Sequence, residues 1–293
     1  MYAIASRYDD REAPANLNPS IMWEAGDQYL DSAKVILDRT YTSSRPSTCQ
    51  SLLLMGYREI GIGAMAQAWT YIGMAIRMAQ DLGMHRSADG WERVGLGGRL
   101  FNDSELNERK RIWSGCVIMD KYVSTYIGLS STFRSQRTYS PFYLGRPLMI
   151  FESDYDTTLP SDGDIEEQEG WVLVNPLGKS LPGVPGRIIS CFNSAADLCT
   201  SVIELATFRF NTQHCYLANI LSRIVQTIYA VRPIPHRYAE SKVLERLLDK
   251  WNIALPDHLR YEPGLSKQLV PLPNVLTLHM QYWCAVLLLH RPL

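Results

Sequence analysis

Apolar residues from Ala68 to Leu82 recur with the period of an α-helix. The recurring residues are Ala68, Ile72, Ala75, Ala79 and Leu82, separated by steps of four, three, four and three. Gly83 follows the last of them, and glycine adopts the left-handed conformation that ends many helices at little steric cost. Met84 is then placed to fold back onto the last turn, while His85 and Arg86 complement the negative end of the helix. The pattern predicts a buried helix that stops at Gly83.

The same period predicts further helices along the chain. They are a helix capped by Ser20, a helix over Cys49–Met55, a long helix with a seam from Ile112 to Ile127, and helices over Arg187–Val231, Ala239–Ile253 and Asn274–Leu289. Ser47 and Gln50 form a capping box for the second of these, and Gly56 is expected to end it. The sequence has no convincing run of alternating strand residues, so the expected fold class is all-α, a multi-helix domain.

An acidic, proline-broken segment divides the chain. Residues 161–170 hold five acids and no base, and three prolines interrupt residues 171–186. A stretch of this composition is typical of a linker or surface loop. We therefore expect a flexible N-terminal segment at 1–18, a first helical half at 19–160, a linker at 161–186 and a second helical half at 187–293.

Composition and charge narrow the functional class. A hydrophobic content of 46% supports a large folded core, and a net charge of −1 lacks the basic surface of a dedicated nucleic-acid binder. The segment Met1–Pro14 is too polar for a secretory signal, and the apolar run Cys284–Leu289 is far shorter than the ~20 residues of a membrane span. We expect a protein inside the cell that does not enter the membrane.

The cysteines do not form a metal-binding pattern. Their positions are 49, 116, 191, 199, 215 and 284, whereas a binuclear zinc cluster needs six thiolates at short spacings. His279 and His290 lie too far apart to share a metal, so packing or hydrogen bonding to a carbonyl is the expected role of each. We expect reduced core cysteines, with no metal site and no cofactor in this chain.

Two charged clusters invite a catalytic or phosphate-binding interpretation. Glu152, Asp154 and Asp156 alternate, but no histidine lies near them in sequence, so a solvated acidic loop is expected. The basic run 109–111 shares its helix with two glutamates, so pairing within the helix is expected instead of phosphate binding. Motifs for a nucleophilic serine or a phosphate-binding loop do not occur in the sequence. We expect no catalytic residue.

Five stretches carry a family resemblance. They are WTYIGMAIRMAQDLGMHR (Trp69–Arg86), ERKRIWSGCVIMDKYVSTYIG (Glu108–Gly128), GRPLMIFESDYDTTLP (Gly145–Pro160), WNIALPDHLR (Trp251–Arg260) and LHMQYWCAVLLLHRP (Leu278–Pro292). In this order they resemble the middle regulatory region of fungal zinc-cluster transcription factors, also called the xylanolytic transcriptional activator regulatory domain. The residues on the family's signature positions are Trp69, Gly83, His85, Glu108, Arg111, Trp113, Asp120, Gly145, Arg146, Pro147, Asp154 and Pro160. Arg146 is expected to anchor neighbouring carbonyls or acids, with Asp120 as one candidate partner.

The resemblance implies an all-α regulatory domain without catalytic activity, located in the nucleus and controlling transcription. Zinc and DNA binding in the family belong to an N-terminal cysteine cluster that this chain lacks, so DNA is expected as a partner only through that separate domain. The other expected partners are transcriptional co-regulators or a small-molecule inducer. A second hypothesis stays open, namely a helical small-molecule-binding protein or enzyme with a pocket between the two halves.

Two stretches interrupt the family pattern. Removing Leu129–Gly145 leaves STYIG followed directly by RPLMI, and Ser201–Ala218 splits what is otherwise one helical pattern. Each stretch is either a tolerated surface loop or translated, unspliced intron. We favour the intron for the first stretch and leave both explanations open for the second. The chain is expected to be a fragment, because it begins after the zinc cluster of the family and stops at Leu293, where the family's domain continues.

Overall fold

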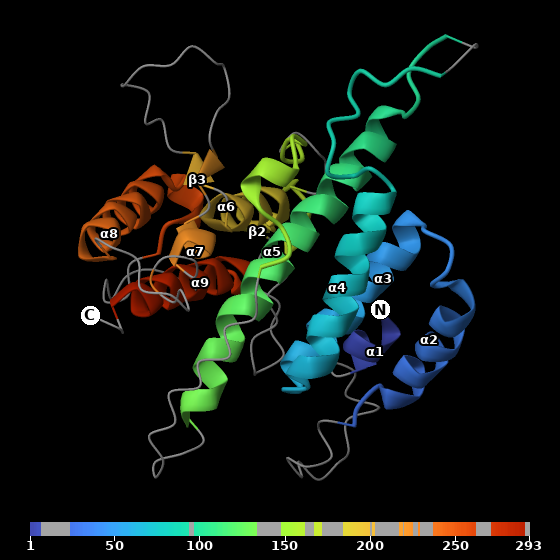
Figure 1. Cartoon of the computed structure of the whole chain (residues 1–293), viewed down its shortest axis with the longest axis horizontal. Coiled ribbons are helices and arrows are strands. Elements are labelled where there is room, and N and C mark those ends of the chain that lie inside the picture. Colours follow the sequence, from blue (N-terminus) through green and yellow to red (C-terminus); the bar gives the residue numbers. More distant parts are fainter. Residues whose placement is uncertain are drawn as a thin grey trace. The chain divides into compact units, whose positions relative to one another are not determined.

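The described residues of the chain fold into two helical units (Figure 1). The computed structural model describes residues 1–6, 24–93, 97–133, 148–161, 167–171, 184–199, 201–202, 217–218, 220–224, 228, 237–261 and 271–290. One unit comprises Met1–Ile150 and Tyr155–Thr157, and the other comprises Phe151–Asp154 and Thr158–Leu293. Extended structure in the described ranges is limited to two antiparallel pairs of two-residue strands and one isolated bridge. The expected all-α class is therefore confirmed.

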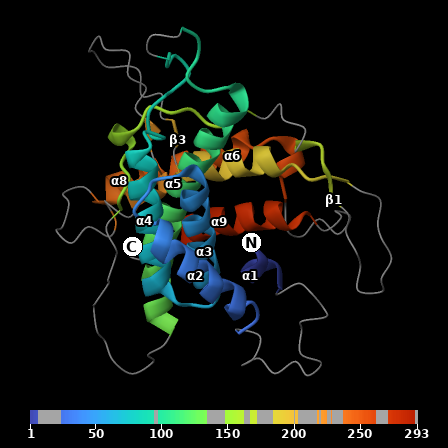
Figure 2. The same ribbon diagram turned by 90° about the vertical axis from the view of Figure 1, so that its right-hand side faces the viewer.

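The first unit is built on three long helices that pack against one another (Figure 2). In chain order its helices are α1 (Tyr2–Ala5), α2 (Asp27–Thr40), α3 (Pro46–Gly61), α4 (Met65–Asp81) and α5 (Asp103–Phe133). Side chains that are at most 3% exposed fill the space between the three long helices, and these are Cys49, Leu52, Ile72, Ala75, Ala79, Ile112 and Cys116. The apolar stripe predicted from the sequence is thus the face of α4 that enters this core.

The end of α4 follows the predicted stop. Gly83 has a φ of +66°, and its N–H donates to the carbonyl of Gln80 at 2.9 Å. The N–H of Met84 donates to the carbonyl of Ala79 at 2.9 Å, which completes a Schellman motif. Met84 is buried, whereas Leu82 is only half-buried. Met84 therefore closes the apolar stripe in place of Leu82.

The predicted limits of α3 are wrong. The helix begins at Pro46, without a capping side chain, and continues through Gly56 to Gly61. Gly56 lies in the helix middle against α4, where an added Cβ would stand 2.7 Å from Cγ1 of Ile72. The glycine is needed for the close approach of two helices, and it does not end α3.

The starts of α2 and α5 use chemistry that the sequence pattern did not single out. Gly26, with a φ of +82°, precedes the first residue of α2, and the predicted cap Ser20 lies outside the described residues. At α5, the side chain of Asn102 accepts from the N–H of Glu105, and the Glu105 carboxylate accepts from the N–H of Asn102, both at 2.8 Å. This reciprocal capping box fixes where α5 begins.

The second unit contains α6 (Ile188–Cys199), α7 (Ile220–Arg223), α8 (Arg237–Ala254) and α9 (Pro273–His290), together with the short 3-10 helices η2 (Glu152–Asp154) and η5 (Asp257–Leu259). Within it α6 contacts α9 and α9 contacts α8 (Figure 2). Trp251 of α8 stacks on Tyr282 of α9 with an interplanar angle of 15°, and its indole N–H donates to the carbonyl of Ser194 at 3.2 Å. The helices predicted over Ala239–Ile253 and Asn274–Leu289 are confirmed.

The predicted helix Arg187–Val231 is interrupted. After α6, strand β3 (Ser201–Val202) pairs antiparallel with β4 (Leu217–Ala218), and Ser201 lies opposite Ala218. The two ends of the predicted insertion Ser201–Ala218 therefore meet at one point of the unit. For the first insertion, α5 continues to Phe133, so the helix runs beyond the Gly128 limit of the family pattern, and residues 134–147 lie outside the described ranges.

Candidate functional site

A buried ion pair on α5 holds the segment that follows the Gly-Arg-Pro motif. Nζ of Lys121 lies 3.2 Å from the carboxylate of Asp120, and both side chains are at most 3% exposed. The carboxylate also accepts from the N–H of Met149 at 3.1 Å and of Ile150 at 3.2 Å. Lys121 donates in turn to the carbonyl of Ile150. These bonds compensate two charges removed from water.

Of the signature residues in this region, the structure describes Asp120 but not the Gly-Arg-Pro motif. Asp120 acts as an anchor for the backbone at Met149 and Ile150. Its expected partner Arg146 lies outside the described residues, as do Gly145 and Pro147. Lys121, which the sequence analysis did not single out, is the charged partner that the structure provides.

His85 and Trp113 form an aromatic cluster at the end of α4. The ring centroids of His85 and Trp113 are 5.8 Å apart, and Tyr155 meets Trp113 edge-on at 5.6 Å. The carbonyl of His85 accepts from the N–H of Asp156 at 3.0 Å, and the Asp156 carboxylate accepts from the N–H of Ser87 at 2.7 Å. The acidic stretch around Asp156 is thus fastened to the turn after Gly83.

The remaining residues of the acidic run serve local structure. Asp154 is exposed and accepts from the N–H of Phe151 at 3.0 Å, which caps the short turn η2. Pro160 is buried, and its carbonyl accepts from the side-chain amide of Asn193 at 3.0 Å. Exposed Asp154 and Asp156 agree with the expected solvated acidic loop.

Arg109 and Lys110 of the basic run do not pair within their helix as expected. Arg109 is buried and donates to the carbonyl of Leu82 at 2.9 Å. Its guanidinium lies over the ring of Phe101 at 4.4 Å, and burial lowers the pKa of Arg109. Lys110 pairs with Asp89 at 3.0 Å, a residue of the preceding loop.

The two glutamates of α5 are engaged elsewhere. Glu105 belongs to the capping box at the start of α5, and Glu108 accepts from the side chain of Gln50 at 3.3 Å. The expected pairing of Arg109 and Lys110 with these acids is wrong, because each of these groups has a partner elsewhere in the fold. Arg109 and Lys110 are used inside the unit, which leaves them poorly placed to bind phosphate.

An apolar groove of about 550 Å³ runs along the exposed side of α4. Trp69, Gly73 and Met74 line it from α4, and Met149 lies beside Gly73. Arg77 and Asp81 also line the groove, and exposed Arg77 forms no ion pair among the described residues. Grooves of this size and character are typical of sites for small ligands or short peptides. The signature residue Trp69 therefore belongs to a surface cavity, where it is 36% exposed.

A second groove, of about 620 Å³, lies between α1, α2 and α3. Tyr2, Ile36 and Arg58 belong to its lining. Arg58 is buried and pairs with Asp27 and Glu59. Both grooves lie within the first unit, so neither is the pocket between two halves that the alternative hypothesis requires.

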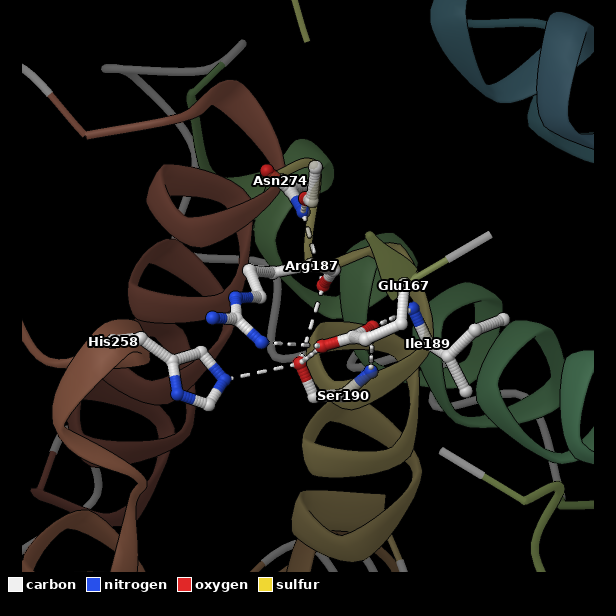
Figure 3. Close-up of polar contacts among 7 residues, drawn as sticks. Glu167, Arg187, Ile189, Ser190, His258 and Asn274 are labelled. Carbon is white, nitrogen blue, oxygen red and sulfur yellow. Dashed lines mark hydrogen bonds and ion pairs between the residues drawn. The ribbon is translucent and has the colours of Figure 1, made fainter. Parts of the chain in front are cut away.

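The second unit contains a cluster of serine, histidine and glutamate at the N-terminus of α6 (Figure 3). The Glu167 carboxylate accepts from the N–H groups of Ile189 and Ser190, both at 3.0 Å, and from the Ser190 hydroxyl at 2.6 Å. Arg187 lies 3.8 Å from the same carboxylate. Nε2 of His258 is 3.2 Å from Oγ of Ser190. Glu167 therefore caps α6 from outside the helix.

The cap is required by the local sequence. Arg187, the residue before α6, has a φ of +52° and a side chain without a hydrogen-bond acceptor. Burial by itself raises the pKa of Glu167, but hydrogen bonds from Ser190 and Ile189 and the charge of Arg187 lower it below its ordinary value. Asn274 of α9 supports the same turn, since its side-chain amide donates to the carbonyl of Gly186 at 2.9 Å.

The cluster differs from a catalytic triad in how its residues are connected. In a triad the histidine takes the serine proton and the carboxylate orients the histidine. Here the carboxylate of Glu167 contacts the serine directly, and the backbone donors of Ile189 and Ser190 are occupied by Glu167. We conclude that this cluster is a helix cap that joins α6, η5 and α9.

Sequence reasoning placed Glu167 in a linker or surface loop, and the structure buries it at 5% exposure. Strands β1 (Gly170–Trp171) and β2 (Val184–Pro185) pair beside it, so the described ends of residues 161–186 are fastened to the start of α6. The only local hint was the absence of a capping side chain before Ile188. The sequence does not indicate that Glu167 is the acid that caps α6, because this pairing is set by the tertiary fold.

The thiols and imidazoles also have structural partners. Hydrogen bonding to Cys49 and burial raise the pKa of Cys116, and burial raises the pKa of Cys191 to about 12. His279 lies with Nε2 2.8 Å from the carbonyl of Leu259, as expected, and His290 lies 3.7 Å from Glu245. Within the described part of the chain, no three His, Cys, Asp or Glu residues gather in a metal-binding arrangement. The helices described here include none long and apolar enough to cross a bilayer.

Comparison with known proteins identifies the family. The model of the family described as "Fungal specific transcription factor domain" matches residues 1–253. The nitrogen assimilation transcription factor nirA of Emericella nidulans is 26% identical over 95% of this chain, and nit-4 of Neurospora crassa is 26% identical over 91%. A TY1 enhancer activator of Saccharomyces cerevisiae is 28% identical over 43% of the chain. No solved structure matches significantly.

The chain spans 27% of the length of nirA and 21% of that of nit-4. The family match covers more than half of the chain and includes the first three stretches that carry the resemblance found in the sequence. The resemblance to fungal transcription factors is thereby confirmed, although the zinc cluster itself is not among the matched features. This chain belongs to the fungal specific transcription factor domain family.

Proposed function

We propose that this chain is the non-catalytic regulatory domain of a fungal transcription factor that acts in the nucleus. The observation that carries the proposal is the family match over residues 1–253. Relatives named as transcription factors, aligned along most of the chain, support it further. The helix-cap arrangement of Glu167, Ser190 and His258 fits a domain in which such groups serve structure.

The regulatory input is a small-molecule inducer or a co-regulator that binds the first unit. The groove along α4 supports this part of the proposal, because its lining is mainly apolar and also contains the charged side chains of Arg77 and Asp81. Regulation requires two states whose balance a ligand or partner shifts by binding one of them more tightly.

A reporter assay tests the regulatory role. The chain is fused between a heterologous DNA-binding domain and an activation segment, and reporter output is measured across nutrient conditions. Met74→Lys places a charge in the α4 groove, and Gln28→Lys adds the same charge at an exposed position of α2 outside the groove. We expect the unmodified chain and Gln28→Lys to change reporter output alike, and Met74→Lys to alter that response. Output that is identical with and without the domain under every condition would remove the support for regulation.

DNA binding and zinc are proposed to reside in a separate domain of the whole protein. The chain has a net charge of −1 and no clustered thiolates in its sequence, so it offers few phosphate contacts and no zinc ligand set. Elemental analysis and a gel-shift titration of the purified chain test this. Stoichiometric zinc, or sequence-specific DNA binding at physiological salt, would contradict it.

A further inference from the structure

We propose that Ser190 is a phosphorylation site for an arginine-directed serine kinase, and that the phosphoserine displaces Glu167 from the N-terminus of α6. Nothing in the family match or in the names of the relatives assigns a modification to this position. The proposal rests on the geometry of the cap in Figure 3 and is independent of the proposed transcriptional role.

The first observation is the sequence that surrounds the hydroxyl. Arg187 stands three residues before Ser190, which is the spacing that arginine-directed kinases select through charge complementarity. Ser194, the other serine of α6, has Cys191 at the equivalent position. Ser190 is half-buried and His258 is exposed, so the hydroxyl faces the surface on the histidine side.

The second observation is that a phosphate-binding set of donors already surrounds Oγ of Ser190. The N–H groups of Ile189 and Ser190 point out of the first turn, Arg187 carries a positive charge beside them, and Nε2 of His258 lies 3.2 Å away. Helix N-termini, arginine and imidazole are groups that stabilise phosphate dianions. In the structure the occupant of this set is the single negative charge of Glu167.

Phosphorylation changes which anion occupies the set. Oγ of Ser190 forms a bond to the γ-phosphorus of ATP, the bond from that phosphorus to the β–γ bridging oxygen breaks, ADP leaves, and the hydroxyl proton passes to the kinase base. The product carries nearly two negative charges at the place where the hydroxyl donated to Glu167. It removes that hydrogen bond and repels the carboxylate, so Glu167 leaves while the helix end keeps an anion.

The release extends to the strand pair beside the cap. The N–H of Gly186 donates to the carbonyl of Glu169 at 2.8 Å, and the N–H of Arg187 donates to the carbonyl of Glu167 at 3.3 Å. Both bonds depend on residues 167–169 staying against the start of α6. Phosphorylation is therefore expected to detach this acidic segment from the second unit and leave α6 folded.

The experiment treats the purified full chain with a calmodulin-dependent serine kinase, magnesium and ATP, followed by peptide mass spectrometry and amide hydrogen exchange. We expect phosphate on Ser190, its loss in Arg187→Gln and in Ser190→Ala, and its retention in the matched control Ser194→Ala. The Gly186 amide is expected to exchange about tenfold faster after phosphorylation, while the Ser190 amide keeps its protection. Glu167→Gln, which weakens the same cap without kinase, is expected to accelerate exchange at Gly186 as well.

Two results would overturn the proposal. One is a wild-type chain that stays unmodified at Ser190 although the kinase phosphorylates a control peptide with arginine three residues before its serine. The other is a phosphorylated chain whose Gly186 amide exchanges as slowly as before, which would show that Glu167 keeps its place. Because the wild-type chain is the main substrate, neither result depends on a variant that fails to fold.

Discussion

Gly56 of α3 lies directly against Ile72 of α4, at a distance that leaves no room for a side chain. A Cβ on residue 56 would stand 2.7 Å from Cγ1 of Ile72 and 3.4 Å from the carbonyl oxygen of Ala68. The close crossing of α3 and α4 thus depends on the absence of one methyl group. This relationship explains why a glycine is placed in a helix interior, where it costs up to about 1 kcal/mol relative to alanine.

Gly56→Val is expected to destabilise the first unit by about 1–3 kcal/mol, because the two helices must move apart or adopt strained rotamers. Thermal denaturation followed by circular dichroism measures the effect. Gly61→Ala is the control, since its added Cβ would meet nothing within 4 Å apart from its chain neighbours and its own helix backbone. Equal melting temperatures for wild type and Gly56→Val would contradict the close α3–α4 contact.

Gly83→Val tests the end of α4. The residue has a φ of +66°, and an added Cβ would stand 3.2 Å from the ring of Trp91. A β-branched residue in the left-handed region costs about 1–3 kcal/mol, so a lower melting temperature is expected. Gly90→Ala, at a glycine without positive φ or close neighbours, should leave the melting temperature nearly unchanged. The Schellman motif would be refuted as a stabilising element if both variants melted like wild type.

Lys121→Met is expected to destabilise the chain by about 3–5 kcal/mol, because it leaves the Asp120 carboxylate buried without its charged partner. The double variant Asp120→Asn with Lys121→Met should recover part of this loss, since a neutral amide oxygen still accepts from the N–H of Met149. Lys110→Met, which breaks a more exposed pair with Asp89, should cost only about 0–1 kcal/mol. Urea denaturation checks the order, and similar losses for both lysine variants would contradict it.

Glu167→Gln tests the cap of α6 through its pH dependence. The pKa of Glu167 is lower in the folded chain than its ordinary value, so the carboxylate stabilises the fold above its ordinary pKa, and this stabilisation is lost as the pH falls through the folded pKa. The variant should be less stable by about 1–2 kcal/mol at neutral pH, as for the loss of a helix cap. The difference from wild type should shrink on acidification below about pH 5. A difference that stays constant with pH would show that the charge of Glu167 is not involved.

Replacement of residues 203–216 by Asn-Gly tests the second insertion. Val202 lies opposite Leu217 in the β3–β4 pair, so a two-residue turn can join them without moving either strand. The shortened chain is expected to unfold with the same cooperativity and within about 0.5 kcal/mol of wild type. Loss of a cooperative transition would show that the segment contributes to the fold, whether it is a loop or retained intron.

Local sequence determined the features that are settled within a few residues. The period of apolar residues and Gly83 together specify both the buried face and the end of α4, because the Schellman motif uses donors and acceptors from consecutive residues. The helices near Ala239–Ile253 and Asn274–Leu289 were predictable for the same reason. In each of them the apolar residues follow the helical period over several turns, so the prediction does not depend on any single residue.

Tertiary structure alone decided the pairing of groups that are distant in sequence. Gly56 does not end α3 but packs against Ile72 of α4. Arg109 donates to the carbonyl of Leu82 and does not pair with a glutamate on its own helix. Glu167 caps a helix that begins about twenty residues later, although it stands in a run of five acids with the same composition as a solvated loop. The local sequence does not specify which residue a charged group will pair with or which residue a glycine will pack against, because in water no such partner is required. The cost of an unpaired buried group then selects the neighbour, and that neighbour depends on the whole fold.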